Sequence, residues 1–322
     1  MINYESDFNG RSCLVTGGAG FIGSNLSRYL ANIGAKVLVI DDFSTGRKMN
    51  VSDFENLGIK LVNSDISNQK ETSKYFSEID YVFHQAAVPS VPRSISEPML
   101  TNNSNVKGTL SVLENSRLNN VKKVIYAASS SAYGDTEILP KKESMISSPL
   151  SPYAVQKLTG EMYCKTYFDN FGLRTTSLRY FNVYGPYQDP NSEYSAVIPI
   201  FIKQALTNKP VKIYGDGSTS RDFTFIDDVI QANLQSATSK KSDGFVVNVA
   251  YGNSFTLTEL ASKIIHTIES ESKIVYEPFR KGDVLHSLAD LSRAKELIDY
   301  TPQFSLSKGL EKTIEFYKKK TV

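Results

Sequence analysis

A glycine-rich turn between two apolar runs constrains the fold of this chain more than any other feature. The run Ser12 to Thr16 (SCLVT) reads as a buried strand and leads into GGAGFIG at 17–23, after which apolar residues follow at helical spacing up to Gly34. Glycine suits this turn because a Cβ would block its tight bend, the approach of a pyrophosphate and close helix packing. Strand, turn and helix in this order predict a dinucleotide site, with the phosphates at the helix N-terminus.

Two acidic residues follow the second expected strand. Lys36 to Ile40 (KVLVI) ends at Asp41 and Asp42, close to the offset of about 20 residues at which a carboxylate meets the ribose hydroxyls of adenosine. A carboxylate here would repel the 2′-phosphate of NADP, so the pair favours NAD. Arg47 and Lys48, a few residues further on, leave NADP open.

Short apolar runs alternate with longer amphipathic ones, which is typical of a parallel sheet with crossover helices. We predict an α/β fold: a Rossmann-type doubly wound parallel sheet of six or seven strands, with a smaller C-terminal substrate-binding lobe. The cofactor domain is expected over 1–180, with strands and helices returning from about 225–250, and the lobe mainly over 181–322. Further strands are expected at 59–63, 81–84, 123–128 and 174–179, and helices at 21–33, 71–77, 99–119, 152–171 and 225–237.

Composition argues against several classes of partner. The chain has 36 Lys and Arg against 34 Asp and Glu, a net charge of +2, so nucleic acid is not expected to bind. No apolar run approaches the roughly 18 residues of a membrane span, and no targeting segment is visible, so we expect a cytoplasmic protein without a membrane partner. Two Cys and three widely separated His offer no metal-ligand spacing, so no metal site is expected.

A tyrosine and a lysine share one face of a predicted helix. The helix begins at Pro152 and places Tyr153 and Lys157 four residues apart. A nearby ammonium lowers the pKa of a phenol and makes it usable as a general base, although this spacing alone proves little. Three serines at 129–131 follow the strand at 123–128, so they lie at the sheet edge where open α/β folds bind ligands. At least two of them could simply satisfy backbone groups of the loop.

Together these motifs resemble the extended short-chain dehydrogenase/reductase family, and within it the NAD-dependent nucleotide-sugar epimerases of the UDP-galactose 4-epimerase type. The resemblance covers nearly the whole chain. It is carried by GGAGFIG, DDFSTG at 41–46, HQAA at 84–87, NVKGT at 105–109, AASSSAYG at 127–134, SPYAVQK at 151–157, RYFNVYGP at 179–186 and RKGDV at 280–284.

The resemblance implies an isomerase that inverts C4 of a UDP-hexose through a transient 4-keto sugar, with NAD taking and returning a hydride. Tyr153 would be the base, Ser129 would lie in its hydrogen-bond chain, and Lys157 would hold the nicotinamide ribose. NAD contacts are implied for Gly17, Gly20, Phe21, Ile22, Gly23, Asp41, Asp42, Ser44, Gly46, Asp65, Ile66, Gln85, Ala86, Ala87, Tyr153, Lys157 and Tyr180. UDP-sugar contacts are implied for Ser90, Ser129, Ser130, Ser131, Asn182, Ala196, Val197, Arg221, Arg280, Asp283 and Ser287.

The resemblance also bears on which sugar is bound. Family members differ just after Arg-x-Gly-Asp, where a bulky Tyr crowds the C2 substituent, and this chain has Ser287 at that position. A small residue predicts that UDP-N-acetylglucosamine (UDP-GlcNAc) and UDP-N-acetylgalactosamine (UDP-GalNAc) are accepted, with UDP-glucose and UDP-galactose as further substrates, unless Ser287 only faces solvent. The run SVPRSI at 90–95 is similar to a subgroup that prefers N-acetylated sugars or their uronic acids, but Pro89 stands where that subgroup has Gly.

Several alternatives stay open. A uronate or N-acetylhexosaminuronate 4-epimerase, a decarboxylase, a simple reductase and an NAD-binding protein without turnover share most of these motifs. A dehydratase ranks lower, because it needs an acid pair where this chain has Ser130 and Ser131. The helices at 99–119 and 152–171 could form a helix bundle in a homodimer, as is frequent in the family, or could pack on the chain's own core.

Overall fold

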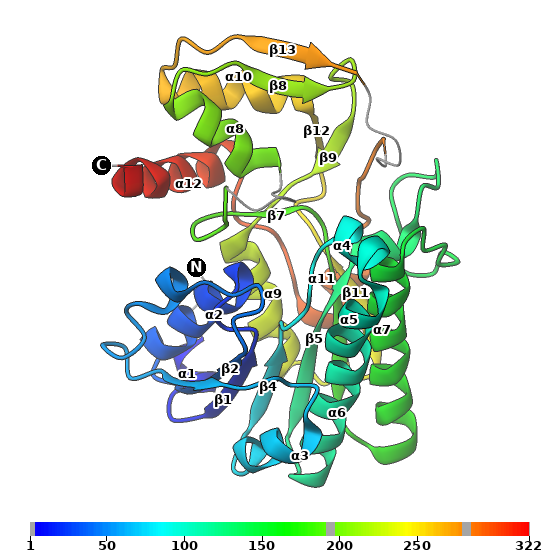
Figure 1. The fold of residues 1–322 in the computed structure, drawn as a ribbon. Coiled ribbons are helices and arrows are strands. Elements are labelled where there is room, and N and C mark those ends of the chain that lie inside the picture. Colours follow the sequence, from blue (N-terminus) through cyan, green and yellow to red (C-terminus); the bar gives the residue numbers. More distant parts are fainter. Residues whose placement is uncertain (1–3, 191–196, 279–284, 322) are drawn as a thin grey trace.

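Seven parallel strands form one sheet at the centre of the molecule (Figure 1). The computed structural model describes residues 4–190, 197–278 and 285–321. The strand order is β11-β6-β5-β4-β1-β2-β3, which confirms the predicted doubly wound sheet. The strands are β1 (Ser12–Thr16), β2 (Lys36–Asp41), β3 (Lys60–Asn63), β4 (Tyr81–His84), β5 (Lys123–Ser129), β6 (Thr175–Tyr180) and β11 (Phe245–Val249).

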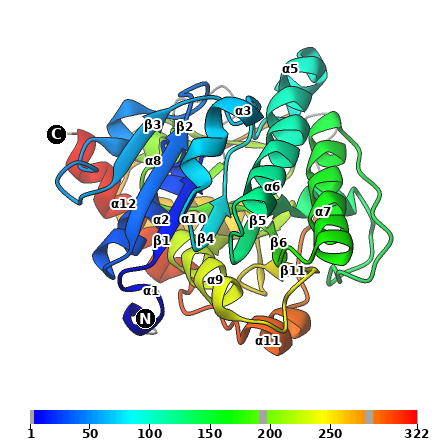
Figure 2. The same cartoon turned by 90° about the horizontal axis from the view of Figure 1, so that it is seen from below.

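Helices cover both faces of this sheet (Figure 2). On one side lie α3 (Gln69–Thr72), α6 (Gly108–Leu118) and α7 (Pro152–Phe171), and on the other α2 (Phe21–Asn32), α9 (Ile226–Thr238) and α11 (Ser292–Ile298). Side chains of β1 alternate accordingly: Cys13 and Val15 pack with Leu26 of α2, whereas Leu14 packs with Val112 of α6. Both faces of the sheet carry apolar side chains, because helices cover both faces.

The second lobe is built from short elements above the carboxyl ends of the strands (Figure 1). Strands β8 and β13 pair in parallel and β9 and β12 pair antiparallel. The parallel pair β7–β10 links the lobe to the sheet domain. The elements are β7 (Val183–Tyr184), α8 (Val197–Leu206), β8 (Val211–Tyr214), β9 (Ser220–Asp222), β10 (Thr224–Phe225), β12 (Ser254–Thr256), α10 (Leu257–Ile268), β13 (Ile274–Glu277) and α12 (Leu306–Thr321).

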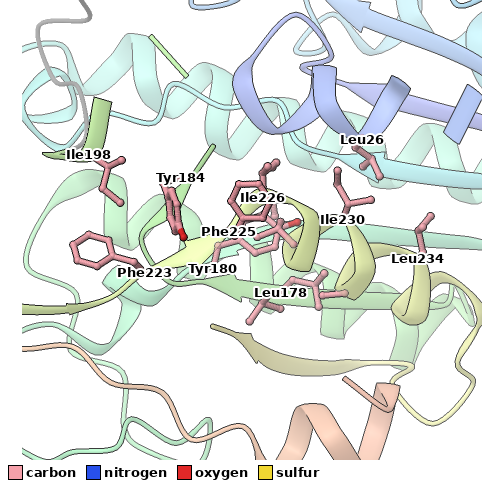
Figure 3. Close-up of a cluster of buried hydrophobic side chains, with 14 of the residues drawn as sticks. Leu26, Leu178, Tyr180, Tyr184, Ile198, Phe223, Phe225, Ile226, Ile230 and Leu234 are labelled. Atoms are coloured by element: carbon pink, nitrogen blue, oxygen red, sulfur yellow. The ribbon is translucent and has the colours of Figure 1, made fainter. Parts of the chain in front are cut away.

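One apolar cluster joins the two parts (Figure 3). It runs from Leu26 in α2 through Ile230 in α9 to Phe225 and Ile198 at the base of the second lobe, and all four side chains are buried. Shared burial of this kind holds the lobe in a defined position over the sheet. The boundary predicted near residue 180 stays a prediction.

Two expected helices are interrupted. The segment 99–119 is divided into α5 (Pro98–Asn102), a π-turn (Asn103–Lys107) and α6, and the helix expected at 71–77 is α3 followed by a 3₁₀ turn (Ser73–Phe76). In the π-turn, Asn105 is buried; its Oδ1 accepts from the backbone N–H of Val88 at 2.8 Å and its Nδ2 donates to the Val88 carbonyl at 3.3 Å. Bulges of this type are frequent at functional sites.

Four short elements complete the described chain: α1 (Glu5–Phe8), α4 (Val91–Ser96), and 3₁₀ turns at Lys48–Val51 and Ser130–Tyr133. Within the described ranges, each helix is too short or too polar to span a bilayer. The cytoplasmic location stays a prediction from the sequence.

Candidate active site

The glycine turn leaves room at the N-terminus of α2. Gly17 has a φ of +71°, and a Cβ on it would lie 2.6 Å from the backbone of Ala86. A Cβ on Gly23 would lie 2.2 Å from the Gly17 carbonyl oxygen, so helix and turn could not pack as closely. The helix begins at Phe21, and the N–H groups of its first turn have no acceptor inside the helix. Free N–H groups beside a narrow glycine cradle fit a pyrophosphate, as the sequence predicts.

A pocket beside this turn is lined by residues from four strand ends, and its polar side chains come mainly from the ends of β2 and β3. Its lining includes eight residues predicted to contact NAD: Gly17, Asp41, Asp42, Ser44, Asp65, Ile66, Ala86 and Ala87. Thr45, Ser64, Val88 and Ser104 also line it and were missed. Ser64 directly follows β3, and its N–H donates to the Asp41 carbonyl, so its position at the sheet edge could have been predicted from the sequence. Ser104 lies in the π-turn, which the sequence pattern does not show.

Asp41 lines this pocket, and backbone hydrogen bonds orient its carboxylate. Its carboxylate accepts hydrogen bonds from the backbone N–H groups of Ala19 and Phe43, both at 2.8 Å. Burial raises the pKa of Asp41 above its usual value, while these two N–H donors oppose the rise. Gly46 packs on it: a Cβ there would lie 2.6 Å from Asp41 Oδ1. The pocket therefore joins the glycine turn to an oriented carboxylate, as the adenosine half of NAD requires.

Ser129, Tyr153 and Lys157 meet where β5 ends and α7 begins. The hydroxyl groups of Ser129 and Tyr153 share a hydrogen bond; burial raises the pKa of Tyr153, and this bond lowers it in part. Lys157 Nζ donates to the carbonyl of Ala127 at 2.8 Å, and burial lowers the pKa of Lys157 to about 8. Ser129 Oγ also accepts from Ser131 Oγ at 2.8 Å. A phenol, a serine hydroxyl and a lysine thus lie together at the carboxyl edge of the sheet.

The start of α7 is anchored by a neighbouring segment. Ser151 caps the helix through the Ala154 N–H at 3.2 Å, and the N–H of Tyr153 itself donates to Ser94 Oγ at 3.0 Å. Ser94 lies on α4, whose N-terminal cap is Ser90. The predicted substrate residue Ser90 is therefore on the segment that contacts the backbone of Tyr153. Ser94 was missed because its role depends on a contact 59 residues away.

A second polar cluster lies on the opposite side of the sheet. Gln85 Nε2 donates to Tyr180 Oη at 3.1 Å and to Asn233 Oδ1 at 3.0 Å, and Asn233 Nδ2 donates to Tyr180 Oη at 2.9 Å. Gln85 and Tyr180 were predicted to contact NAD. Asn233 was not, although an asparagine that is fully buried on α9 among apolar neighbours is a detectable exception to the helix pattern.

Three predicted substrate residues come together at the second lobe. Asn182 Nδ2 donates to Ser287 Oγ at 3.1 Å, and Arg221 Nη1 donates to the carbonyl of Leu285 at 2.9 Å. Asn182 lies two residues after Tyr180, which is the register partner of Ser129, so this group lies at the same sheet edge as Ser129. Val197 begins α8, whereas Ala196, Arg280 and Asp283 lie outside the described residues.

Comparison with known proteins agrees with this geometry. The model of the "NAD dependent epimerase/dehydratase family" matches residues 13–250. A UDP-glucose 4-epimerase of Mycolicibacterium smegmatis is 37% identical over 313 residues, covering 96% of this chain and 99% of that protein. The structure of a UDP-N-acetylglucosamine 4-epimerase from Methanobrevibacter ruminantium, in complex with UDP-N-acetylmuramic acid, has a TM-score of 0.93 and 38% identity, covering 97% of this chain and 100% of that one.

A third relative was solved with the cofactor. A UDP-glucuronic acid 4-epimerase from Bacillus cereus, in complex with UDP-glucuronic acid and NAD, has a TM-score of 0.87 and 34% identity, covering 96% of this chain and 99% of that one. The glycine cradle and the oriented Asp41 fit the same cofactor here. The chain therefore belongs to the NAD dependent epimerase/dehydratase family of extended short-chain dehydrogenases/reductases, as an isomerase whose cofactor is NAD.

Proposed function

We propose that this protein interconverts UDP-GlcNAc and UDP-GalNAc by inverting C4, and that it also acts on UDP-glucose and UDP-galactose. The observation that carries the proposal is the hydrogen-bonded pair of Ser129 and Tyr153, with Lys157 held beside it at the edge that also bears the NAD pocket. Ser287 supports the N-acetylated sugars, because its small side chain leaves room at the position predicted to face C2.

The residues divide the chemistry between them. Bound NAD supplies the redox step, accepting a hydride from C4 and returning it to the other face of the 4-keto sugar. Tyr153 takes the proton from the sugar O4 and later returns it, and Ser129 holds that proton in a hydrogen bond. Burial lowers the pKa of Lys157 to about 8, and as an ammonium one helical turn after Tyr153 it would favour the phenolate form of that residue in the proposed reaction.

The activity can be tested directly. Purified protein incubated with UDP-GlcNAc and no added NAD is expected to produce UDP-GalNAc until both epimers are at equilibrium, because the cofactor is regenerated in each turnover. Chromatography that resolves the C4 epimers measures this, with UDP-glucose and the two corresponding uronates in parallel reactions. If only a uronate is epimerised, the uronate is the substrate and the proposed substrate is wrong. If none of the four sugar nucleotides is epimerised, the proposed reaction is wrong.

We also propose that the protein is a homodimer, joined by a helix bundle. Helices α6 and α7 lie side by side on the outside of the sheet (Figure 2). Together with α5 they expose several large apolar side chains. These are Met99, Leu118, Val155, Met162 and Phe171, with Met162 61% exposed.

The homodimer can be tested by light scattering. The wild-type protein is expected to have twice the chain mass of 35.8 kDa, and Met162→Glu is expected to lower the measured mass toward that of the monomer. A wild-type protein that is monomeric at micromolar concentration would contradict this.

A further inference from the structure

Residues 42–47, which we call the cofactor loop, form one side of the pocket beside the glycine turn. Asp42, Ser44 and Thr45 line this pocket together with the oriented carboxylate of Asp41. The pocket has the parts that the adenosine half of NAD requires. NAD bound there would contact the cofactor loop, so the contacts that hold this loop bear on how long NAD stays bound.

Two hydrogen bonds shape the cofactor loop from within. The N–H of Phe43 donates to Asp41 Oδ1 and that of Ser44 donates to Asp42 Oδ1, both at 2.8 Å. Bonds of this type, from a backbone N–H to an aspartate two residues earlier, fix the shape of a turn. They do not fix the turn to the rest of the molecule. The position of the loop has to come from contacts with more distant segments.

Arg47 makes such contacts in two directions. Its N–H donates to the Ala19 carbonyl at 3.0 Å, and the N–H of Ala19 donates in turn to Asp41 Oδ2 at 2.8 Å. Its Nη1 lies 3.0 Å from Oδ1 of Asp189, on the segment after β7. Arg47 thus joins the cofactor loop to the glycine turn through its backbone, and to the base of the second lobe through its charge.

The segment that carries Asp189 is fixed by other contacts. It is joined to α12, because the Tyr317 hydroxyl donates to the carbonyl of Gln188. It is also joined to α2, since Asn25 Nδ2 donates to the carbonyl of Pro186 at 3.0 Å. The carboxylate of Asp189 is therefore presented from a defined position, which reduces the entropy lost when it pairs with an arginine.

The ion pair between Arg47 and Asp189 is neither buried nor fully exposed. The two side chains are 31% and 29% exposed. Partial burial weakens the screening of the pair by salt, while the water that remains keeps the desolvation cost low. A pair of this kind gives a modest stabilisation and can open and close. It suits a contact that must break when a cofactor leaves.

We propose that Asp189 is a positioning residue for the NAD site, and that its ion pair with Arg47 holds the cofactor loop against bound NAD and slows the release of NAD. The inference concerns the NAD-bound protein and requires no particular sugar. Slow release also suits the proposed reaction, because the hydride taken from C4 must return to the same sugar. If the reduced cofactor left first, a 4-keto sugar would remain.

The test is the rate at which NAD leaves the protein in the absence of sugar. Protein loaded with radiolabelled NAD is mixed with a large excess of unlabelled NAD, and the label that stays bound is measured by gel filtration at successive times. Asp189→Asn keeps the size of the side chain and removes its charge. Its release rate is expected to be about 2- to 5-fold higher than that of wild type, the range for a partly exposed ion pair.

A double-mutant cycle separates the ion pair from a general loosening of the lobe. Arg47→Gln is expected to raise the release rate by a similar factor, and it serves as the test if Asp189→Asn does not fold. The two changes together are expected to raise the rate no further, because either change breaks the pair. Added salt is expected to speed release from wild type more than from Asp189→Asn, since only wild type has the pair to screen.

Glu277→Gln is the matched control. It breaks an ion pair with Lys212, at 3.1 Å, that joins β8 and β13 outside the pocket lining, and it should leave the release rate unchanged. A release rate in Asp189→Asn equal to that of wild type, or single effects that multiply in the double variant, would overturn this inference and leave the proposed epimerisation standing. Failure of the proposed function would appear instead in the sugar assay, as a lack of C4 epimers from wild type.

Discussion

Tyr153→Phe is expected to lower kcat for C4 epimerisation by about 10²- to 10⁴-fold while NAD remains bound. In the proposed reaction the phenol takes the O4 proton, and Ser129, its hydrogen-bond partner, cannot replace it because a serine hydroxyl is a far weaker acid than a phenol. The ring itself stays, so the packing at the start of α7 is retained. Turnover of UDP-GlcNAc and the NAD content of the purified protein are the two measurements.

A matched control is available on the same helix. Tyr163 lies ten residues further along α7 and is half-buried, so Tyr163→Phe removes a phenol oxygen without touching the site. Its kcat is expected to stay within about twofold of wild type. Near-normal turnover in Tyr153→Phe would contradict the prediction and assign the proton transfer to another group. A loss of NAD from that variant would show that the substitution impairs cofactor binding rather than proton transfer.

The sheet could be predicted from the sequence because its signals are local. The glycine turn, the apolar runs and the carboxylates after β2 each depend on residues close together in the chain, and β1 and β4 match their expected bounds. The π-turn could not be predicted in this way. Within it, Asn105 forms hydrogen bonds with the backbone of Val88, 17 residues away, and nothing in the helical spacing shows that contact.

The same distinction applies to the candidate site. Tyr153 and Lys157 are visible from their spacing within one turn, whereas Ser94 and Asp222 act through partners that only the fold brings near. Asp222 was not singled out, although it is the immediate neighbour of the predicted Arg221, because its burial and its partners are not visible in the local sequence. Its burial depends on three N–H groups from segments up to 67 residues away.

The largest expected loss of stability comes from a buried ion pair between α7 and β6. Arg179 Nε and Nη2 donate to the two carboxylate oxygens of Glu161 at 2.9 and 2.7 Å, and each side chain is 4% exposed. Glu161→Ala would leave the Arg179 guanidinium buried without the carboxylate that it binds, and among the described residues its Nη1 already has no hydrogen-bond partner. The free energy of unfolding is therefore expected to fall by about 3–5 kcal/mol, measured by chemical denaturation.

Two further variants separate charge from packing in this prediction. Glu161→Leu combined with Arg179→Met removes both charges and keeps apolar volume, so it is expected to recover most of the loss. Asp169→Ala breaks the exposed pair with Lys165 on the same helix and should cost less than about 1 kcal/mol, because water already solvates both groups. A loss in Glu161→Ala as small as that in Asp169→Ala would contradict the argument, since it would mean that the buried guanidinium finds solvent or another partner. Glu161 lies one turn beyond Lys157, so the large loss would also show that the face of α7 that carries Lys157 is held in place by charge neutralisation and not by apolar contacts alone.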